Sequence, residues 1–333
     1  MKRREWMARA AVLVILIGLP VAIFAYEIVI RPRLAGHRVI DIAAAVPEAG
    51  GFQPNAISVQ AGETVTLRFR SVDVTHGVAI GPALGIDLGH IEPGHIKEVT
   101  LTFDKSGTYT FYCNTWCSVN HWRMRGIVDV ADPAHARPTP QRDPVIEALA
   151  TQGINIDDDP TMSNMASAMT PTSLFTQRPS AQRGGTLIDK VNIPSELRDL
   201  AWRRTHSPVE ALQTLIALNP SMAQTDLADV VAYLWIGNLS PDLLESSASL
   251  YARNCGACHG ETGDGKGFAA NLIVKTPVAF ADISRMTARR SDILYAKIRR
   301  GGMGTDMPNF GTLFTPGETW ALVDYLWKLA LGG

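Results

Sequence analysis

The sequence contains few cysteines and few histidines for its length. Its 333 residues include four cysteines and eight histidines. The cysteines form two close pairs, Cys113 with Cys117 and Cys255 with Cys258. A chain outside the cytoplasm with four cysteines would ordinarily form two disulfides, but both pairs have spacings typical of cofactor ligands. No cysteine is then left for a structural disulfide.

The sequence also lacks an excess of either charge. Lys and Arg number 31 against 32 Asp and Glu, which gives a formal net charge of −1. A balance this even provides no global attraction to nucleic acid, to anionic lipid or to an acidic partner. We therefore expect no nucleic acid among the partners. The 46% of hydrophobic residues are enough for two or three ordinary domain cores.

A long apolar run stands at the N-terminus, where residues 10–26 are uncharged and residues 28–30 extend the run. At about 1.5 Å per residue it crosses a hydrocarbon core of about 30 Å. Four basic residues precede the run and two follow it closely, which predicts a cytoplasmic N-terminus and an exported remainder. A cleaved signal peptide is the alternative, but its apolar core would have about 7–15 residues, and Ile23 stands where a small residue is preferred. We expect an uncleaved membrane anchor over residues 1–33.

Residues 34–131 show the alternation of apolar and polar side chains that is typical of β-strands. Turn residues at 104–107 separate two of the expected strands. The pattern predicts a compact antiparallel β-sandwich. The strands expected most clearly are 64–70, 98–103, 108–112 and 126–130.

One loop of this block concentrates sulfur and nitrogen ligands. Residues 113–124 read CNTWCSVNHWRM, and His76 stands far upstream. Two thiolates, two imidazoles and a thioether suit copper and are too rich in sulfur for magnesium or calcium. A mononuclear blue-copper site needs one cysteine, whereas two thiolates on one loop can bridge two copper ions. Zinc would leave Met124 without a role, and a disulfide between cysteines four positions apart would be strained.

This pattern resembles the binuclear Cu-A domain of subunit II of haem–copper oxidases, in its one-helix branch. The family motif is Cys-x3-Cys-x3-His-x2-Met with a second histidine on an earlier strand end. The resemblance implies that the residue midway between the cysteines, Thr115, lends its backbone carbonyl. Many members have Glu there, which also meets a magnesium ion beside subunit I, and threonine cannot do this. The copper ligands implied are His76, Cys113, Thr115, Cys117, His121 and Met124.

Composition changes over residues 132–195 to Pro, Ser, Thr, Gln, Arg and Met, which predicts a linker with weakly ordered loop. Its three methionines at 162, 165 and 169 have the spacing of one face of a short helix and are expected to pack. Residues 196–241 are expected to be helical. There VAYLW at 231–235 matches VDYLW at 323–327, which suggests an internal repeat. Without a CxxCH motif, this segment is interpreted as a haem-free, cytochrome c-like remnant.

The segment Cys255-Gly-Ala-Cys258-His259 is a CxxCH motif. In such motifs the cysteines hold haem through thioethers and the histidine is the proximal iron ligand. A thioredoxin-like CxxC is the alternative, but the adjacent His259 and the lack of a βαβ pattern argue against it. Three other histidines, His90, His95 and His206, have no ligand spacing and are interpreted as solvent-facing or structural.

Residues 242–333 resemble the class I cytochromes c. In that family the distal ligand lies in a Met-Pro segment, which selects Met307 over Met303. The resemblance also places the carbonyl of Pro277 against the proximal histidine. Histidine and methionine together fill both axial positions, which suits electron transfer over oxygen binding. Helices are expected at 242–253 and 292–300, and the last begins with a capping box at 315–318.

The two resemblances predict a multidomain chain with an N-terminal transmembrane helix, an all-β cupredoxin sandwich, a helical middle segment and an all-α cytochrome c domain. They imply subunit II of cytochrome c oxidase, in the bacterial cytoplasmic membrane, with its C-terminal domains in the periplasm. A periplasmic donor such as cytochrome c or a cupredoxin would pass electrons through haem c and Cu-A to subunit I, which reduces dioxygen to water.

Three other classes of protein contain some of these parts. A nitric oxide reductase with a Cu-A subunit has all of them, because its catalytic metal lies in the partner chain. A nitrous oxide reductase needs a histidine-rich propeller, which eight histidines and no such repeat exclude. A stand-alone copper chaperone does not account for the fused cytochrome.

Overall fold

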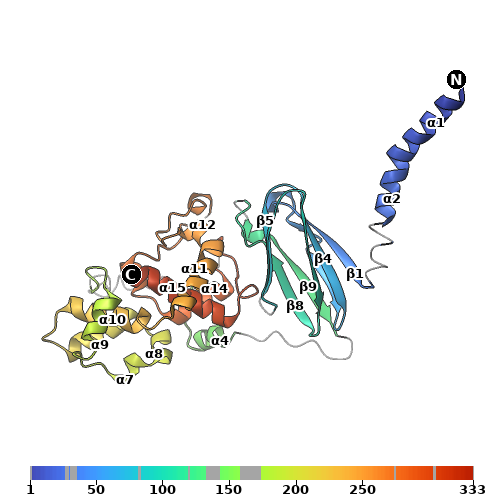
Figure 1. The fold of residues 1–333 in the computed structure, drawn as a ribbon. Coiled ribbons are helices and arrows are strands. Elements are labelled where there is room, and N and C mark those ends of the chain that lie inside the picture. Colours follow the sequence, from blue (N-terminus) through green and yellow to red (C-terminus); the bar gives the residue numbers. More distant parts are fainter. Residues whose placement is uncertain are drawn as a thin grey trace.

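The structure is a computed structural model that describes residues 2–26, 30, 36–81, 84–118, 121–132, 143–157, 174–273, 275–302 and 305–332. An apolar helix, a β-sandwich and a helical region follow one another along the chain (Figure 1). The expected fold class is confirmed. The three methionines at 162–169 and Met303 lie outside the described residues.

The N-terminal helix consists of α1 (Lys2–Leu13), η1 (Val14–Gly18) and α2 (Leu19–Ala25). Over Glu5–Ala25 its mean hydropathy is 2.4, and by length and composition it could cross a membrane. The side chains of η1 and α2 make no buried contact. Such a helix agrees with a single membrane span, and whether it stays attached remains a prediction.

Two sheets form the sandwich. Their strand orders are β2-β1-β4-β7 and β3-β9-β8-β5-β6. The strands expected at 64–70, 98–103, 108–112 and 126–130 are present as β4, β7, β8 and β9, and burial alternates along β9, whereas residues 65–69 of β4 are all buried. The strands are β1 (Arg38–Ala44), β2 (Phe52–Gln53), β3 (Ala56–Gln60), β4 (Thr64–Ser71), β5 (His76–Gly81), β6 (Ile86–Ile91), β7 (Ile96–Thr102), β8 (Gly107–Tyr112) and β9 (Arg125–Ala131).

The expectation of a purely antiparallel sandwich was wrong. Strand β1 pairs with β4 in parallel, and β3 pairs with β9 in parallel. The other pairs among the described strands are antiparallel. An alternating pattern fixes which face of a strand is buried but not the direction of its neighbour, and both parallel pairs join strands far apart in sequence.

An aromatic cluster fills the sandwich beneath the loop that follows β8. Phe52, Phe69 and Phe111 meet edge to face, with ring centroids 5.2–5.8 Å apart. Each ring is at most 1% exposed. The Phe111 ring lies over Gly126 of β9, where an added Cβ would come within 2.1 Å of it. Because residue 126 is glycine, the Phe111 ring has room over β9. The aromatic cluster therefore reaches the start of the loop at Cys113.

The helical region has one continuous core, to which the segments before and after residue 240 both contribute. Its first part contains α6 (Ala181–Leu187), α7 (Ser195–Arg198), α8 (Leu200–Thr205), α9 (Pro208–Leu218) and α10 (Gln224–Ile236). Its second part contains α11 (Pro241–Asn254), α12 (Gly256–His259), η7 (Ala270–Leu272), α13 (Ile283–Met286), α14 (Ser291–Arg300) and α15 (Pro316–Leu331).

The expected linker over 132–195 was too long, because it contains α6 and also α4 (Pro144–Thr151). Asp143 caps α4 and accepts hydrogen bonds from Tyr295 and Arg299 on α14, both at 2.9 Å. Short helices of this kind depend on tertiary contacts that composition does not reveal. The helix expected near 196–204 is also divided, because the backbone is extended at Asp199 between α7 and α8.

The two parts of the helical region pair their first and last helices in the same way. Helix α6 packs on α10 so closely that a Cβ at Gly184 would lie 2.9 Å from Tyr233. In the second part α11 packs on α15, where Tyr251 meets Tyr325 with centroids 5.3 Å apart. Tyr233 and Tyr325 hold the same place in the repeated five-residue motif. This correspondence supports the proposal of a cytochrome-like repeat without CxxCH in the first part.

Candidate copper and haem sites

The side chains expected to bind copper come from two neighbouring strands of one sheet. His76 is the first residue of β5, and Cys113 follows the end of β8. The loop returns through the short helix η4 (His121–Arg123) to Met124, just before β9. The amide of Cys113 donates to the carbonyl of Met124 at 3.0 Å, which closes the loop at its base. Pairing of β8 with β9 therefore fixes both ends of the ligand loop.

The sulfur atoms of this loop converge. The Sγ atoms of Cys113 and Cys117 are 3.9 Å apart, and Cys117 Sγ lies 3.8 Å from Met124 Sδ. A disulfide would bring the two Sγ atoms to about 2.05 Å, and both cysteines are free. Ligand atoms of His76, Cys113 and Cys117 all lie within 4.8 Å of one another. The carbonyl oxygen of Thr115 is 3.0 Å from Cys113 Sγ.

Two buried imidazole nitrogens test whether this site fits a metal. His76 is 0% exposed and His121 is 7% exposed. The Nδ1 atom of each is buried without a hydrogen-bond partner among the described residues. A buried nitrogen left unpaired costs about 1–3 kcal/mol, and a metal bond would remove this cost. With two thiols and a thioether beside them, the residues present fit copper.

Asp73 fixes the orientation of one of these rings. Its Oδ1 lies 2.7 Å from Nε2 of His76, which leaves Nδ1 of that ring as the metal-binding atom. The amides of Val46 and Val74 also donate to the Asp73 carboxylate. Burial alone would lower the pKa of His76, but Cys113 and Asp73 together outweigh it and raise the pKa. Sequence reasoning missed Asp73, although an acidic residue three positions before a ligand histidine is a signal that could have revealed it.

The two thiols hold their protons unequally. The hydrogen bond with Cys117 is the largest of the effects that lower the pKa of Cys113 to about 3. Hydrogen bonds with His121 and His76 also lower this pKa, whereas burial raises it. The hydrogen bond between the two thiols and burial raise the pKa of Cys117. These contacts favour the thiolate at Cys113 over that at Cys117, and the thiolate is the form of cysteine that binds metals. A metal would displace the remaining proton.

The CxxCH motif lies at the end of α11 and in α12. Cys255 and Cys258 are free, so both remain available to haem. His259 Nδ1 lies 3.0 Å from the carbonyl oxygen of Val278, and its ring stacks on Phe280 at 4.5 Å. Burial lowers the pKa of His259, which keeps the imidazole neutral. A neutral ring that donates from Nδ1 has its Nε2 lone pair free for iron, so these residues fit haem.

We had expected the Pro277 carbonyl to hold His259. The structure shows that the Val278 carbonyl holds it instead. The Pro277 carbonyl lies instead near Gly265, where an added Cβ would be 3.0 Å away. The chain at 275–279 has no regular secondary structure. The sequence therefore does not reveal which of two successive carbonyls faces the ring.

The loop that carries Met307 is folded back on α14. The Met307 amide donates to Thr305 Oγ1 at 3.1 Å, and the amide of Gly302 donates to the Met307 carbonyl at 3.2 Å. Gly301 has φ +81°, and an added Cβ there would lie 2.8 Å from the Met307 carbonyl. Met307 packs partly buried against the helical core. Its role as the distal ligand remains a prediction.

Three histidines without an assigned role are where we expected them. His90 and His95 are exposed on the sandwich. His206 stacks on Trp202 with centroids 4.0 Å apart, and its Nδ1 lies 2.9 Å from the Trp202 carbonyl. His206 is therefore a structural residue in the first part of the helical region.

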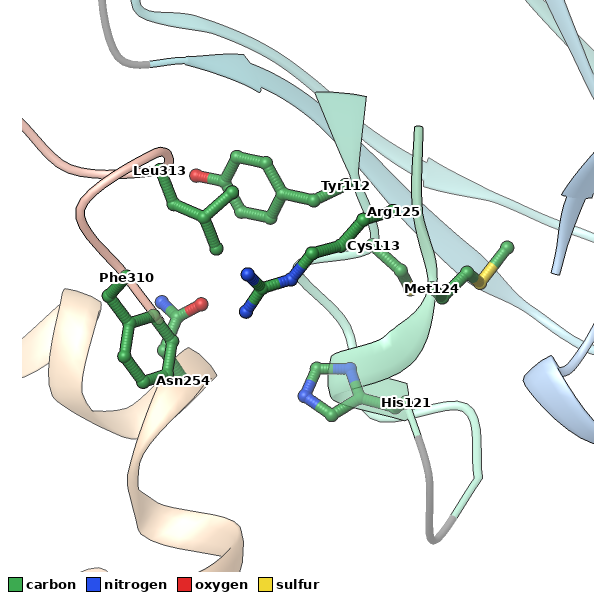
Figure 2. Close-up of a pocket in the computed structure, with 8 residues that line it drawn as sticks. All are labelled: Tyr112, Cys113, His121, Met124, Arg125, Asn254, Phe310 and Leu313. Carbon is green, nitrogen blue, oxygen red and sulfur yellow. The ribbon is translucent and has the colours of Figure 1, made fainter. Parts of the chain in front are cut away.

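The copper loop meets the helical region at a small cavity of about 10 Å³. Figure 2 shows Phe310 and Leu313 on one side of it and the copper loop on the other. Asn254, the residue before Cys255, also lines the cavity. Sequence reasoning missed this contact, because no motif marks a surface between two domains. The cavity is lined by Tyr112, Cys113, His121, Met124, Arg125, Asn254, Phe310 and Leu313.

Comparison with protein-family models identifies both globular parts. Residues 30–126 match the cupredoxin-like domain, and residues 245–330 match cytochrome c. The chain combines a cupredoxin-like domain with a cytochrome c domain. The first kind of domain implies copper and the second implies haem.

Two curated relatives are both cytochrome c oxidase subunit 2, and both come from Thermus thermophilus. Each is 33% identical to this chain over 85 residues, or 25% of this chain. The match covers 61% of one relative and 49% of the other, so the chain spans about half the length of the curated relatives it matches.

Solved structures similar to the chain include the periplasmic domain of cytochrome oxidase subunit II (CoxB) of Bradyrhizobium japonicum. It is 19% identical, with a TM-score of 0.24, over 29% of this chain and 85% of that one. A chain of a heme-copper terminal oxidase dimer is 20% identical, with a TM-score of 0.25, over 38% of this chain and 99% of that one.

Proposed function

We propose that this chain is the electron-transfer subunit II of a haem–copper terminal oxidase. It would pass electrons from a periplasmic donor through haem c and a binuclear Cu-A centre to subunit I, which reduces dioxygen to water. The observation that supports this best is the meeting of the two ligand sets, since Cys113 and the neighbour of Cys255 line the same cavity. The similarity to subunit 2 of cytochrome c oxidase supports the same conclusion.

The copper ligands would be His76, Cys113, Cys117, His121, Met124 and the carbonyl of Thr115. Copper bound by such ligands exchanges one electron at a time. The chain contributes a rigid site, because the base of the loop is closed by the hydrogen bond between Cys113 and Met124. Two free thiols 3.9 Å apart support a binuclear site. Thr115 offers no carboxylate for the magnesium ion that many members of the family bind.

Haem c would be attached through Cys255 and Cys258, with His259 and Met307 as axial ligands. Haem held by a histidine and a methionine would supply one-electron transfer. The chain orients the proximal ring through the Val278 carbonyl and through stacking on Phe280.

The N-terminal helix would anchor the chain in the bacterial cytoplasmic membrane, with the two globular parts in the periplasm. The catalytic site would belong to the membrane partner, because neither ligand set leaves an open coordination position for a substrate. The donor would be a cytochrome c or a cupredoxin, soluble or bound to the membrane.

Purification of the full-length chain with its native membrane partner tests this function. We expect a haem-containing membrane subunit to copurify, with about two coppers bound by this chain and one covalent haem. The complex should consume dioxygen when a reduced cytochrome c is added. A complex that reduces nitric oxide and not dioxygen would make the chain the Cu-A subunit of a nitric oxide reductase. A chain that purifies without a membrane partner would contradict both functions.

A further inference from the structure

The sandwich and the helical region touch at the ends of β5, β8 and β9, at Asp87 of β6 and at Trp116 of the copper loop. The opposing surface consists of residues 309–314, which follow Met307, of the C-terminal end of α11 and of Phe268. We call this contact the copper–haem interface. Its described contacts join Arg125 to Asn309 and Phe310, Gly81 to Leu313, Arg253 to Asp87, and Trp116 to Phe268.

Arg125 is at the centre of this interface. It is the first residue of β9 and directly follows the copper-ligand candidate Met124. Its Nη1 donates to the carbonyl oxygen of Asn309 at 2.6 Å. Its guanidinium lies 5.8 Å from the centre of the Phe310 ring. One side chain thus connects the strand after Met124 to the segment after Met307.

The backbones of the two domains also approach closely beside Arg125. A Cβ added to Gly81 of β5 would lie 2.7 Å from the carbonyl oxygen of Leu313. Its contact with Tyr112 of the same domain would be an ordinary one at 3.7 Å. Any larger residue at 81 must therefore displace the segment around Leu313, while the sandwich itself can accept it.

Two further contacts flank the centre. Arg253 Nη1 donates to Asp87 Oδ2 of β6 at 2.7 Å, two residues before Cys255. Both side chains are more than two-fifths exposed, at 41% and 43%, so this pair contributes little by itself. Trp116, which stands between the two copper-loop cysteines, meets Phe268 edge to face at 4.2 Å. Each flank therefore joins a residue near one candidate cofactor site to a residue near the other.

The space beside Arg125 is small. Its cavity of about 10 Å³ touches Cys113, His121 and Met124. A cavity needs at least about 10–15 Å³ of this kind to hold a single water. At this cavity, Cys113, His121 and Met124 are packed closely against the cytochrome. A wider opening of about 630 Å³ lies beside it, between residues 114–116 of the copper loop and residues 252–268.

We propose that Arg125 is a positioning residue that holds the segment after Met307 against the copper loop, so that the two centres exchange electrons across a fixed contact within one chain. This inference rests on the proposed function. A linker with weakly ordered loop, as the sequence predicts over residues 132–195, would not by itself hold the cytochrome in one place. The side of the copper loop at Cys113 and His121 faces the cytochrome, whereas Trp116 borders the wider opening.

The experiment uses the full-length chain in detergent, loaded with copper and haem. Arg125→Ala removes the hydrogen bond, and Gly81→Ala introduces a collision from the other side without changing Arg125. The controls are Arg285→Ala, whose exposed pair with Asp282 lies on α13, and Gly317→Ala, where a Cβ would have only one neighbour, at 3.9 Å. The double variant Arg125→Ala/Gly81→Ala combines the two changes.

Two measurements report the contact directly. Small-angle neutron scattering with the detergent matched out gives the maximum dimension of the chain, with or without cofactors. Pulsed electron resonance gives the relaxation of the copper signal, which a nearby haem iron accelerates. Loss of one hydrogen bond from a charged group lowers the ratio of docked to released chains by about 10- to 100-fold. We expect the double variant to extend and its copper signal to relax more slowly, while both controls match the unaltered chain.

The electron-transfer readout follows on the same samples. After a flash reduces the haem, the copper should be reduced several-fold more slowly in the double variant, with unchanged optical spectra of both centres. A double variant that stays compact, with unchanged relaxation, would overturn the role of Arg125. A chain that fails to bind copper or haem would contradict the proposed function. The interface could still be measured in that chain, because scattering needs no cofactor.

Discussion

The copper site and the haem site differ in where their residues come from. The copper ligands are gathered from two strands that lie side by side in a sheet, and four of them are less than 8% exposed: His76, Cys113, His121 and Met124. Three of the four haem residues stand in one five-residue segment, and only Met307 comes from a distant loop. The copper site therefore depends on the tertiary fold, whereas most of the haem site is a local motif.

The same comparison applies to the histidine in each site. His76 is held by the carboxylate of Asp73, and His259 is held by the backbone carbonyl of Val278. A carboxylate can be removed by one substitution, but a backbone carbonyl cannot. The copper site should therefore be more sensitive to changes among the residues that support its ligands.

Cys117→Ser should have the largest effect, because it removes one of the two thiolates that would bridge the metals. We expect bound copper to fall from about two ions per chain to one or fewer, and the multi-line electron resonance of a shared unpaired electron to vanish. The haem spectrum should not change. Unaltered copper content in this variant would refute the binuclear site.

Met307→Ala should have a smaller effect, limited to one axial position. Haem should stay attached through Cys255 and Cys258, while its reduction potential falls and carbon monoxide binds. Met303→Ala is the matched control and should leave all three properties unchanged. If Met303→Ala gives the carbon monoxide complex instead, the axial ligand is Met303.

The repeated motif allows a third prediction. Ala232 is 0% exposed in α10, and Asp324 holds the matching place in α15. Burial raises the pKa of Asp324 from 3.8 to about 6, although Arg204 and Arg203 act in the opposite direction. Because its pKa is raised in the folded state, the contribution of Asp324 to the free energy of unfolding is largest below pH 4. This contribution is lost as the pH rises to about 6.

Asp324→Asn should remove this loss. Above pH 6 the helical region should gain up to about 3 kcal/mol of unfolding free energy, and below pH 4 it should gain nothing. Denaturant titration of the full chain, followed by the haem absorbance, measures the difference. The exposed Glu245→Gln on α11 serves as the control. A gain that is equal at both pH values would show that the carboxylate does not titrate as expected.

Asp73→Asn should change the amount of bound copper least, since every copper ligand remains. Loss of a partner that orients a ligand histidine typically lowers metal affinity by about 10- to 100-fold. Competition with a copper chelator measures the change, and Glu92→Gln on the exposed loop before β7 is the control. Equal chelator sensitivity in the two variants would remove Asp73 from the copper site.

Local sequence patterns predicted those features that depend on neighbours in the chain. The capping box at Thr315 and Glu318 is present, because both of its hydrogen bonds join residues three positions apart. The CxxCH segment was recognised from its cysteine spacing, although the short helix α12 that it forms was not predicted. Four strands, at 64–70, 98–103, 108–112 and 126–130, were predicted from their side-chain pattern, whereas β5 and β6 were not.

The features that the sequence did not reveal depend on contacts between distant segments. The parallel pairing of β1 with β4 is one of them, since direction leaves no mark in an alternating pattern. Helix α6 contains two glycines and was interpreted as linker, yet Gly184 is what allows it to pack against α10. Arg125 was not singled out in the sequence, because its partner is a backbone carbonyl 184 positions away.

The contact between Arg125 and Asn309 joins two domains of a single chain, and this changes the kinetics of their encounter. A separate cytochrome would reach the copper loop at a rate proportional to its concentration, and dilution would slow it. Within one chain the local concentration is set by the length of the connecting segment and stays the same at any dilution. Reduction of copper by haem should therefore be first order, with a rate constant independent of how much protein is present.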